Sequence, residues 1–169
     1  MTTLAQKQNT LAWIAQRFVG SIETRPNGGP IVEMFQKTVD GISSGEPWCV
    51  GFAWFCVQAI DDLAVMLNGG AANSKLCRTE WTIALWNDSP HKYSDPSLGR
   101  IVVWKNDINP NRGHCGIVIG VDGNDIITVE GNTSAAIGDQ REGDGVWKKK
   151  RPGGNIHGFT RLGYLGPWE

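Results

Sequence analysis

A β-hairpin is predicted by residues 114–132, which read HCGIVIGVDGNDIITVEGN. Both halves alternate larger apolar residues with small or polar ones, which is the pattern of a strand with one buried face. The triplet DGN at 122–124 is typical of the turn that joins two antiparallel strands. The odd-numbered positions carry a core face made of Cys115, Ile117, Ile119, Val121, Ile127 and Val129.

The length of this turn sets which residues face each other across the hairpin. A three-residue loop at 122–124 pairs Val121 with Asp125 and places His114 opposite Asn132. Both of the latter side chains then lie on the even-numbered face. We therefore expect an imidazole and a carboxamide at one end of that face.

Glu130 also falls on the even-numbered face, as a diagonal neighbour of this pair. Gly116 and Gly120 on the same face have no side chain, which leaves room for a helix to approach the sheet closely. The candidate is a buried helix predicted over residues 48–67. We expect this helix to pack on the face that carries the polar side chains.

Helices are predicted before the hairpin, and further strands flank it. Apolar residues at helical spacing predict helices at 4–19, 31–39, 48–67 and 79–86. Period-two stretches bounded by turn residues predict strands at 100–105, 114–121, 125–131, 146–150 and 156–162. This segregation indicates an α+β fold, with N-terminal helices packed on a C-terminal antiparallel sheet of about five to six strands.

Length and charge limit the class of protein. The 169 residues suffice for one core, so we expect a single domain over 1–169. The formal net charge of -1 gives no electrostatic drive toward nucleic acid. The first residues lack the pattern of a secretory signal, and no apolar run approaches the roughly 18 to 20 residues of a membrane span. We expect a monomer with no nucleic-acid partner, no membrane insertion and no signal peptide.

Cys49 is a candidate nucleophile because it lies at the start of the helix predicted at 48–67. A sulfur at a helix N-terminus lies near unpaired backbone N–H groups and the positive end of the helix dipole, both of which favour the thiolate. An imidazole at His114 would favour it further, and a polar side chain would orient the ring. The same N–H groups are placed to hold the oxyanion of an acyl-transfer intermediate.

Three short blocks carry a resemblance to a known family. They are GEPWCVGF at 45–52, GHCGIV at 113–118 and VEGNT at 129–133. Together they resemble the signatures of CHAP domains, the cysteine, histidine-dependent amidohydrolases/peptidases. That papain-like group cleaves peptidoglycan peptides and is common in phage endolysins. The resemblance therefore implies a papain-like CHAP fold and peptidoglycan as the partner.

The resemblance also implies a role for each matched residue. Cys49 corresponds to the nucleophile, His114 to the general base and then acid, and Glu130 and Asn132 to the polar pair that orients the imidazole. Which member of this pair contacts the ring stays open. Cys115 departs from the family, which more often has an aliphatic residue there. We expect it on the opposite face, away from the mechanism.

Other features have more than one interpretation. Trp48 adjoins Cys49 and is a candidate wall of a substrate-binding groove. Cys77 precedes a predicted helix and is a rival thiol, although no strand histidine is matched to it. The basic run at 148–151 is interpreted as a solvated strand edge, with attraction to anionic envelope polymers as the alternative.

A metal site is not expected. Cysteine and histidine occur together, but without the C-x-x-C or paired-histidine spacing of a zinc site. Asp107, Asn109 and Asn111 imitate the start of a calcium-binding loop, yet the twelfth position is Val118 where such a loop needs Glu. We expect a plain turn there, and neither metal nor cofactor.

These inferences predict a peptidoglycan hydrolase that cleaves an amide or peptide bond of the wall peptide through a thioester on Cys49. With no separate cell-wall-binding domain, it resembles an endolysin that stays in the host bacterial cytoplasm before lysis and then acts on the wall. Alternatives with the same chemistry are a bacterial wall-degrading effector and a virion-associated lysin. An alternative of a different class is a catalytically inactive module that binds wall peptides.

Overall fold

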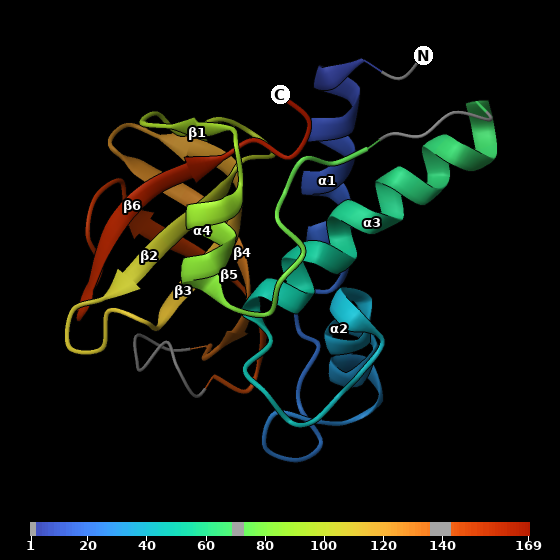
Figure 1. The fold of residues 1–169 in the computed structure, drawn as a ribbon. Helices are drawn as coiled ribbons and strands as arrows, with labels where there is room; N and C mark the ends of the chain where they lie inside the picture. Colours follow the sequence, from blue (N-terminus) through green and yellow to red (C-terminus); the bar gives the residue numbers. More distant parts are fainter. Residues whose placement is uncertain (1–2, 69–72, 136–142) are drawn as a thin grey trace.

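The computed structural model describes residues 3–68, 73–135 and 143–169. Within these residues the chain forms four helices and one six-stranded antiparallel sheet, in the strand order β1-β6-β2-β3-β4-β5 (Figure 1). The helices are α1 (Leu4–Arg17), α2 (Pro30–Asp40), α3 (Cys49–Asn68) and α4 (Thr82–Asp88). The strands are β1 (Lys92–Tyr93), β2 (Ile101–Asn106), β3 (Gly113–Asp122), β4 (Asp125–Thr133), β5 (Gly145–Pro152) and β6 (Phe159–Leu165). The predicted α+β fold is confirmed.

Local sequence explains where the helices begin and end. The side chain of Thr3 and that of Gln6 form reciprocal hydrogen bonds with each other's backbone N–H, which closes the first turn of α1. Pro30 opens α2, and Gly41 ends it at φ +88, in the left-handed region that favours glycine. α4 begins three residues later than predicted, because the Thr79 hydroxyl accepts a hydrogen bond from a backbone N–H two residues on and forms a turn.

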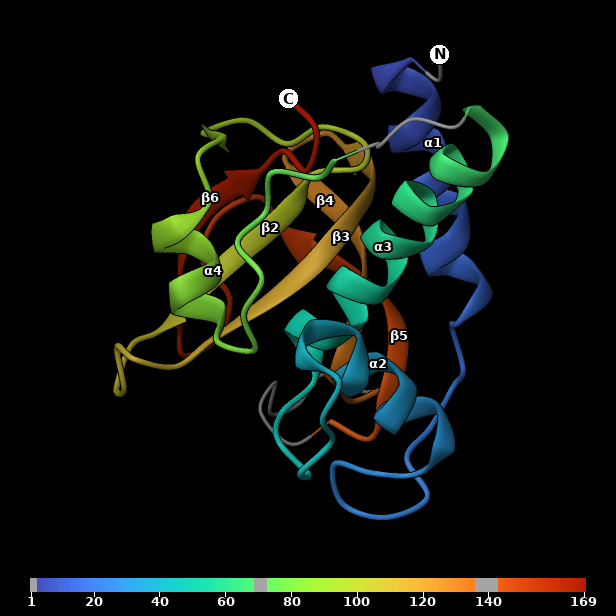
Figure 2. The ribbon, with the colours of Figure 1, turned by 45° about the vertical axis from the view of Figure 1, so that its right-hand side comes forward.

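The central helix is α3, which packs against α1 and α2 on one side and against β3 and β4 on the other (Figure 2). Within the described residues, its Cys49–Leu67 segment is long and apolar enough to cross a membrane by length and composition alone. The expectation that no such run exists was therefore wrong. Half of the segment is buried in the fold, and most of its buried residues belong to the main core, so the apolar composition suits a core helix.

The helix covers the odd-numbered face of the hairpin, and the prediction that it packs over Gly116 and Gly120 was wrong. A Cβ on Gly116 would lie 2.6 Å from Cγ of Glu130, so this glycine makes room for a carboxylate. The close approach of the helix occurs at Gly131, where a Cβ would lie 2.6 Å from Cβ of Phe52. The main core joins residues of α3 and of the odd-numbered face, including Phe52, Val57, Cys115, Ile117 and Val129.

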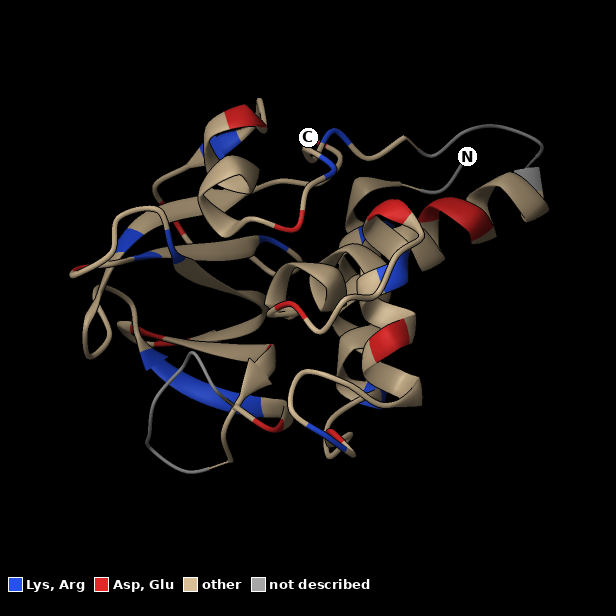
Figure 3. Ribbon diagram, turned by 60° about the horizontal axis from the view of Figure 1, so that its bottom comes forward, with Lys and Arg blue, Asp and Glu red and all other residues tan. Residues whose placement is uncertain are grey.

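The even-numbered face is enclosed by the sheet itself. The sheet curls (Figure 3). Buried side chains from β2, β3, β4, β6 and the turn before β6 form a second, smaller core. Its members are Val102, Trp104, Val118, Ile126, Ile156, Phe159 and Tyr164. Both faces of the sheet are therefore buried, each against a different partner.

The hairpin register differs from the prediction near the turn. Asp122 pairs with Asp125 across a two-residue turn, which shifts the pairing by one residue. A β-bulge at Ile119 then takes up one residue, so Val118 pairs with Thr128, as the predicted register requires. Because the bulge cancels the shift, the site end of the hairpin keeps the predicted alternation.

Candidate active site

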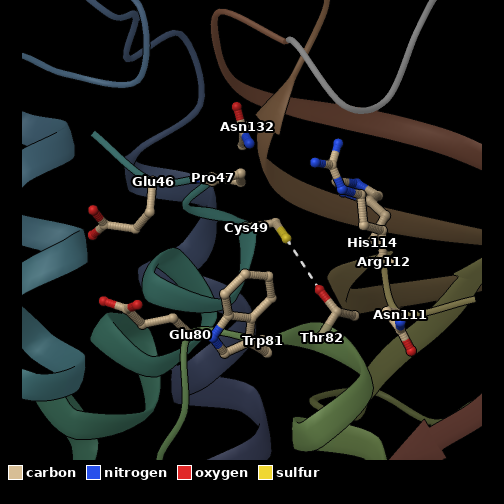
Figure 4. A pocket seen from close by; sticks show the side chains of 11 residues that line it. Glu46, Pro47, Cys49, Glu80, Trp81, Thr82, Asn111, Arg112, His114 and Asn132 are labelled. Carbon is tan, nitrogen blue, oxygen red and sulfur yellow. Dashed lines mark hydrogen bonds between the residues drawn. The ribbon is translucent and has the colours of Figure 1, made fainter. Parts of the chain in front are cut away.

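Cys49 is the first residue of α3 and is 5% exposed. Its Sγ lies 3.6 Å from Oγ1 of Thr82, the first residue of α4 (Figure 4). The pKa of the Cys49 thiol is held well below its usual value, first by a hydrogen bond with the Cys115 thiol and then by the hydrogen bond and charge of His114, although burial opposes this. These neighbours favour the thiolate at Cys49.

His114 lies near the start of β3 and is 2% exposed. Its Nε2 is 2.8 Å from Oε2 of Glu130, and its ring stacks on that of Trp104 with the ring centroids 6.0 Å apart. Burial alone would lower the pKa of His114, but hydrogen bonds with Cys49 and Glu130, and their charges, raise it to about 9. Because Glu130 holds Nε2, the nitrogen left for Cys49 is Nδ1. The two partners favour a thiolate–imidazolium pair.

Glu130 is the residue that contacts the imidazole. Its side chain is fully buried and accepts hydrogen bonds from three side chains: His114, the Thr128 hydroxyl at 2.6 Å, and the Arg151 guanidinium. Arg151 binds both carboxylate oxygens, with Nε at 2.9 Å and a terminal nitrogen at 2.6 Å. Burial would raise the pKa of Glu130, but Arg151 and His114 lower it to about 2. Glu130 is therefore a carboxylate that fixes the ring.

Asn132 lies in the same site, but among the described residues it makes no hydrogen bond to the imidazole. It is 2% exposed, and its φ of +54 lies in the left-handed region, where β4 departs from regular pairing with β5. Its Oδ1 is buried and has no hydrogen-bond partner among the described residues. The question left open by the sequence thus has an answer: Glu130 is the member of the pair that contacts the imidazole of His114, whereas Asn132 lines the cleft.

Cys115 lies closer to the site than expected. It is fully buried, and its pKa is raised well above the usual value, first by its hydrogen bond with Cys49 and also by burial. The prediction that it lies away from the mechanism was wrong because α3 packs on the odd-numbered face, which is the face of Cys115. Cys56 is buried in the core, as predicted, and burial raises its pKa. Cys77 is partly buried, and burial raises its pKa as well.

A cleft of about 180 Å³ opens beside the sulfur. Its walls come from the loop before α3, the start of α4, the turn between β2 and β3, and the ends of β3 and β4 (Figure 4). Cys49, His114 and Asn132 all line it. The structure therefore brings three of the predicted site residues to one solvent-accessible cleft, with Glu130 behind them.

Trp48 does not line this cleft, so its predicted place in a substrate groove was wrong. It is 1% exposed, stacks on Phe35 with the ring centroids 5.6 Å apart, and donates from Nε1 to Glu23 at 2.7 Å. The aromatic wall is Trp81, which is 64% exposed. The spacing of tryptophans along the chain carries no signal that distinguishes these two.

Arg151 was missed because the basic run at 148–151 was interpreted as a solvated edge. The run lies on β5, seen as a blue strand in Figure 3, where side chains alternate between two faces. Lys148 and Lys150 are exposed, as expected, but Lys149 is 9% exposed and the Arg151 side chain 11%. The interpretation was wrong for these two residues. Period-two alternation was the signal that could have identified them.

No metal centre is evident in the part of the chain that the structure describes. There, no group of three or more His, Cys, Asp or Glu is arranged to hold a metal ion. In the calcium-like loop, Asp107 accepts a hydrogen bond from the Thr160 hydroxyl at 2.7 Å. Asn109 accepts one from the backbone N–H of Asn111 at 3.2 Å. These polar groups support the turn.

The fold and the site define a papain-like α+β protein with a cysteine and a histidine in one cleft. Comparison with protein families finds that the CHAP domain matches residues 41–132, more than half of the chain. The chain belongs to the CHAP domain family, a family of peptidoglycan amidases and peptidases that generally use cysteine and histidine. The matched residues include Cys49, His114, Glu130 and Asn132, whereas Arg151 lies beyond them. Comparison with curated proteins finds no matching relative.

Proposed function

We propose that this protein hydrolyses peptidoglycan by cleaving an amide or peptide bond of the wall peptide, with Cys49 as the nucleophile. The observation that carries the proposal is the relay from the buried Cys49 thiol through His114 to Glu130, whose oxygen lies 2.8 Å from the imidazole. Membership of the CHAP family supports peptidoglycan as the substrate.

The geometry supports a two-step reaction. The Cys49 thiolate attacks the scissile carbonyl carbon, and the carbonyl electron pair moves to oxygen. The first backbone N–H groups of α3, which have no intrahelical partner, hold this oxyanion. The His114 imidazolium then gives its proton to the leaving nitrogen as the C–N bond breaks, which leaves a thioester on Cys49.

Deacylation uses the same groups in reverse. Neutral His114 takes a proton from water while the oxygen of that water attacks the thioester carbonyl. The C–S bond breaks, the acid product leaves, and the thiolate–imidazolium pair is restored. Glu130 keeps the ring in place in both steps, so the cycle needs no cofactor.

We further propose the setting of an endolysin: a monomer made in the cytoplasm of a phage-infected bacterium that acts on the wall at lysis. The resemblance to phage lytic enzymes supports this setting, and a bacterial effector or a virion-associated lysin would share the chemistry. The inactive wall-peptide-binding module is less well supported. A pure binder has no need of a thiol whose pKa is lowered beside an imidazole whose pKa is raised.

The test is wall digestion followed by mass spectrometry of the new termini. Purified peptidoglycan is incubated with wild type, Cys49→Ala and, as a matched control, Cys77→Ala. We expect wild type and Cys77→Ala to release fragments at similar rates and Cys49→Ala to release none. New L-alanine amino termini on stem peptides freed from muramic acid identify an amidase, whereas termini within the stem or cross-bridge identify an endopeptidase. Equal lysis by wild type and Cys49→Ala would refute the mechanism.

A further inference from the structure

The charges that line the cleft are separated on either side of the nucleophile. Glu46 and Glu80 lie at one end with their carboxylates facing the same space, and Arg112 lies at the other end, beside His114 (Figure 4). Cys49 lies between the two ends. A peptide that crosses the cleft therefore passes from an acidic end to a basic end on either side of the reacting sulfur.

These charges are not neutralised within the described part of the chain. The side chains of Glu80 and Arg112 make neither a hydrogen bond nor an ion pair there. Glu46 accepts from Ser44 through Oε2, but its Oε1 is buried and lacks a partner among the same residues. Burial raises the pKa of Glu80, and the negative charges of Glu46 and Asp40 raise it further. A cation at this end would satisfy both carboxylates.

Two neighbours suit a peptide that carries an ammonium group. Trp81 is 64% exposed and lies between the carboxylates and the sulfur, so its ring offers a face to a cation (Figure 4). The Asn132 side chain is 98% buried, lines the same cleft, and keeps an unused acceptor oxygen. The cleft thus offers acceptors and negative charge beyond what the catalytic residues use.

We propose that the cleft selects its substrate by charge: a wall peptide with a free ammonium group at the Glu46 and Glu80 end and a carboxylate at the Arg112 end. The chemical class is a stem peptide whose diamino acid has an unsubstituted side-chain amine. This inference rests on the proposed hydrolysis and adds the group that determines which peptides are cleaved. Glu46, Glu80 and Arg112 are specificity-determining residues in this view.

The test compares two forms of one substrate. Muropeptides released from purified wall are divided, and in one half the free amines are acetylated. Cleavage of each half by wild type is followed by chromatography to obtain kcat/KM. We expect wild type to prefer the free amine roughly tenfold, the effect of one charge-assisted hydrogen bond. Glu80→Gln should remove most of this preference, because kcat/KM for the free-amine form falls toward that for the acetylated form.

Controls separate charge recognition from general damage. Glu33→Gln changes a partly buried carboxylate of α2 outside the cleft and should keep the tenfold preference. Arg112→Gln should slow cleavage of peptides with a free carboxylate more than cleavage of their carboxamide forms. Equal cleavage of both amine forms by wild type would overturn this inference and leave the proposed hydrolysis standing. An equal fall in kcat/KM for the free-amine and acetylated forms in Glu80→Gln would also overturn this inference. If wild type cleaves neither form, the proposed function is overturned as well.

Discussion

Arg151→Met is expected to damage the site through Glu130, without touching the substrate. The guanidinium binds both oxygens of a carboxylate that has no exposed surface, and its own side chain is 11% exposed. Methionine keeps most of the length and apolar stem but removes both hydrogen bonds and the charge. Glu130 would then be a buried carboxylate held by Thr128 and His114 alone.

The magnitude follows from the burial of this pair. Removing one partner of a buried ion pair costs about 3–5 kcal/mol of the free energy of unfolding, because the remaining charge stays buried. The pKa of Glu130 is lowered from 4.5 to about 2 in the fold, so the stability that its charge contributes is complete above pH 4.5 and is lost as the pH falls toward 2. The difference in stability between wild type and Arg151→Met should therefore be full at pH 7 and nearly vanish at pH 2.

Activity should change in the same direction. Without Arg151, burial raises the pKa of Glu130, so the carboxylate takes up a proton at a higher pH and holds the imidazolium less well. We expect kcat/KM at neutral pH to fall roughly tenfold, the value of one charge-assisted hydrogen bond, and the acid limb of its pH profile to move to higher pH. KM should change little because Arg151 does not line the cleft.

Urea unfolding at pH 7 and pH 2, together with pH profiles of wall hydrolysis, measures these effects. Arg151→Lys, which keeps the charge but not the two-point geometry, should recover part of both losses. Lys150→Met, an exposed neighbour on the same strand, is the matched control and should behave as wild type. An acid limb and an unfolding free energy unchanged in Arg151→Met would refute the reasoning that Arg151 holds Glu130 in its ionised form.

Three further predictions concern the thiol, the imidazole and the two tryptophans. Iodoacetamide at neutral pH should alkylate Cys49 much faster than Cys56, as measured by peptide mass spectrometry, and equal rates would contradict a lowered thiol pKa. The kcat/KM of hydrolysis should fall as the pH rises through about 9, where His114 loses the proton that the leaving amine needs; a flat profile to pH 10 would argue against His114 as the acid. Trp48→Ala should lower the free energy of unfolding by about 3–5 kcal/mol, because the ring is buried, whereas Trp81→Ala should lower kcat/KM with little change in urea unfolding; the reverse pattern would contradict their placement.

Much of the site could be predicted because local rules cover it. Two-residue alternation places His114 and Glu130 on one face of the hairpin. The position of Cys49 at a helix N-terminus identifies it as a thiol whose pKa is lowered. The predicted register was wrong at the turn, yet the bulge at Ile119 restored it at the site end. The predicted face of His114 and Glu130 was correct because side-chain alternation along each strand fixes which residues share a face, even when the turn length is wrong.

Other features depend on how distant elements pack. Because the hydrophobic effect is non-directional, an apolar face in the sequence does not show which element will cover it. Both faces of β3 are apolar enough to be buried, so only the fold shows that α3 takes the face of Cys115 and the curled sheet takes the other. The choice between Trp48 and Trp81 as the cleft wall has the same origin.

The chain's local pattern thus specifies the elements and the chemistry that they carry, because hydrogen-bonding periodicity and helix-end electrostatics act over a few residues. Long-range packing specifies the connections: Glu130 against His114, Arg151 behind Glu130 from 21 residues away, and the separated charges of the cleft. These contacts form between side chains whose separation in space is set by the sheet and the curl of its strands. For that reason only the tertiary structure shows these contacts.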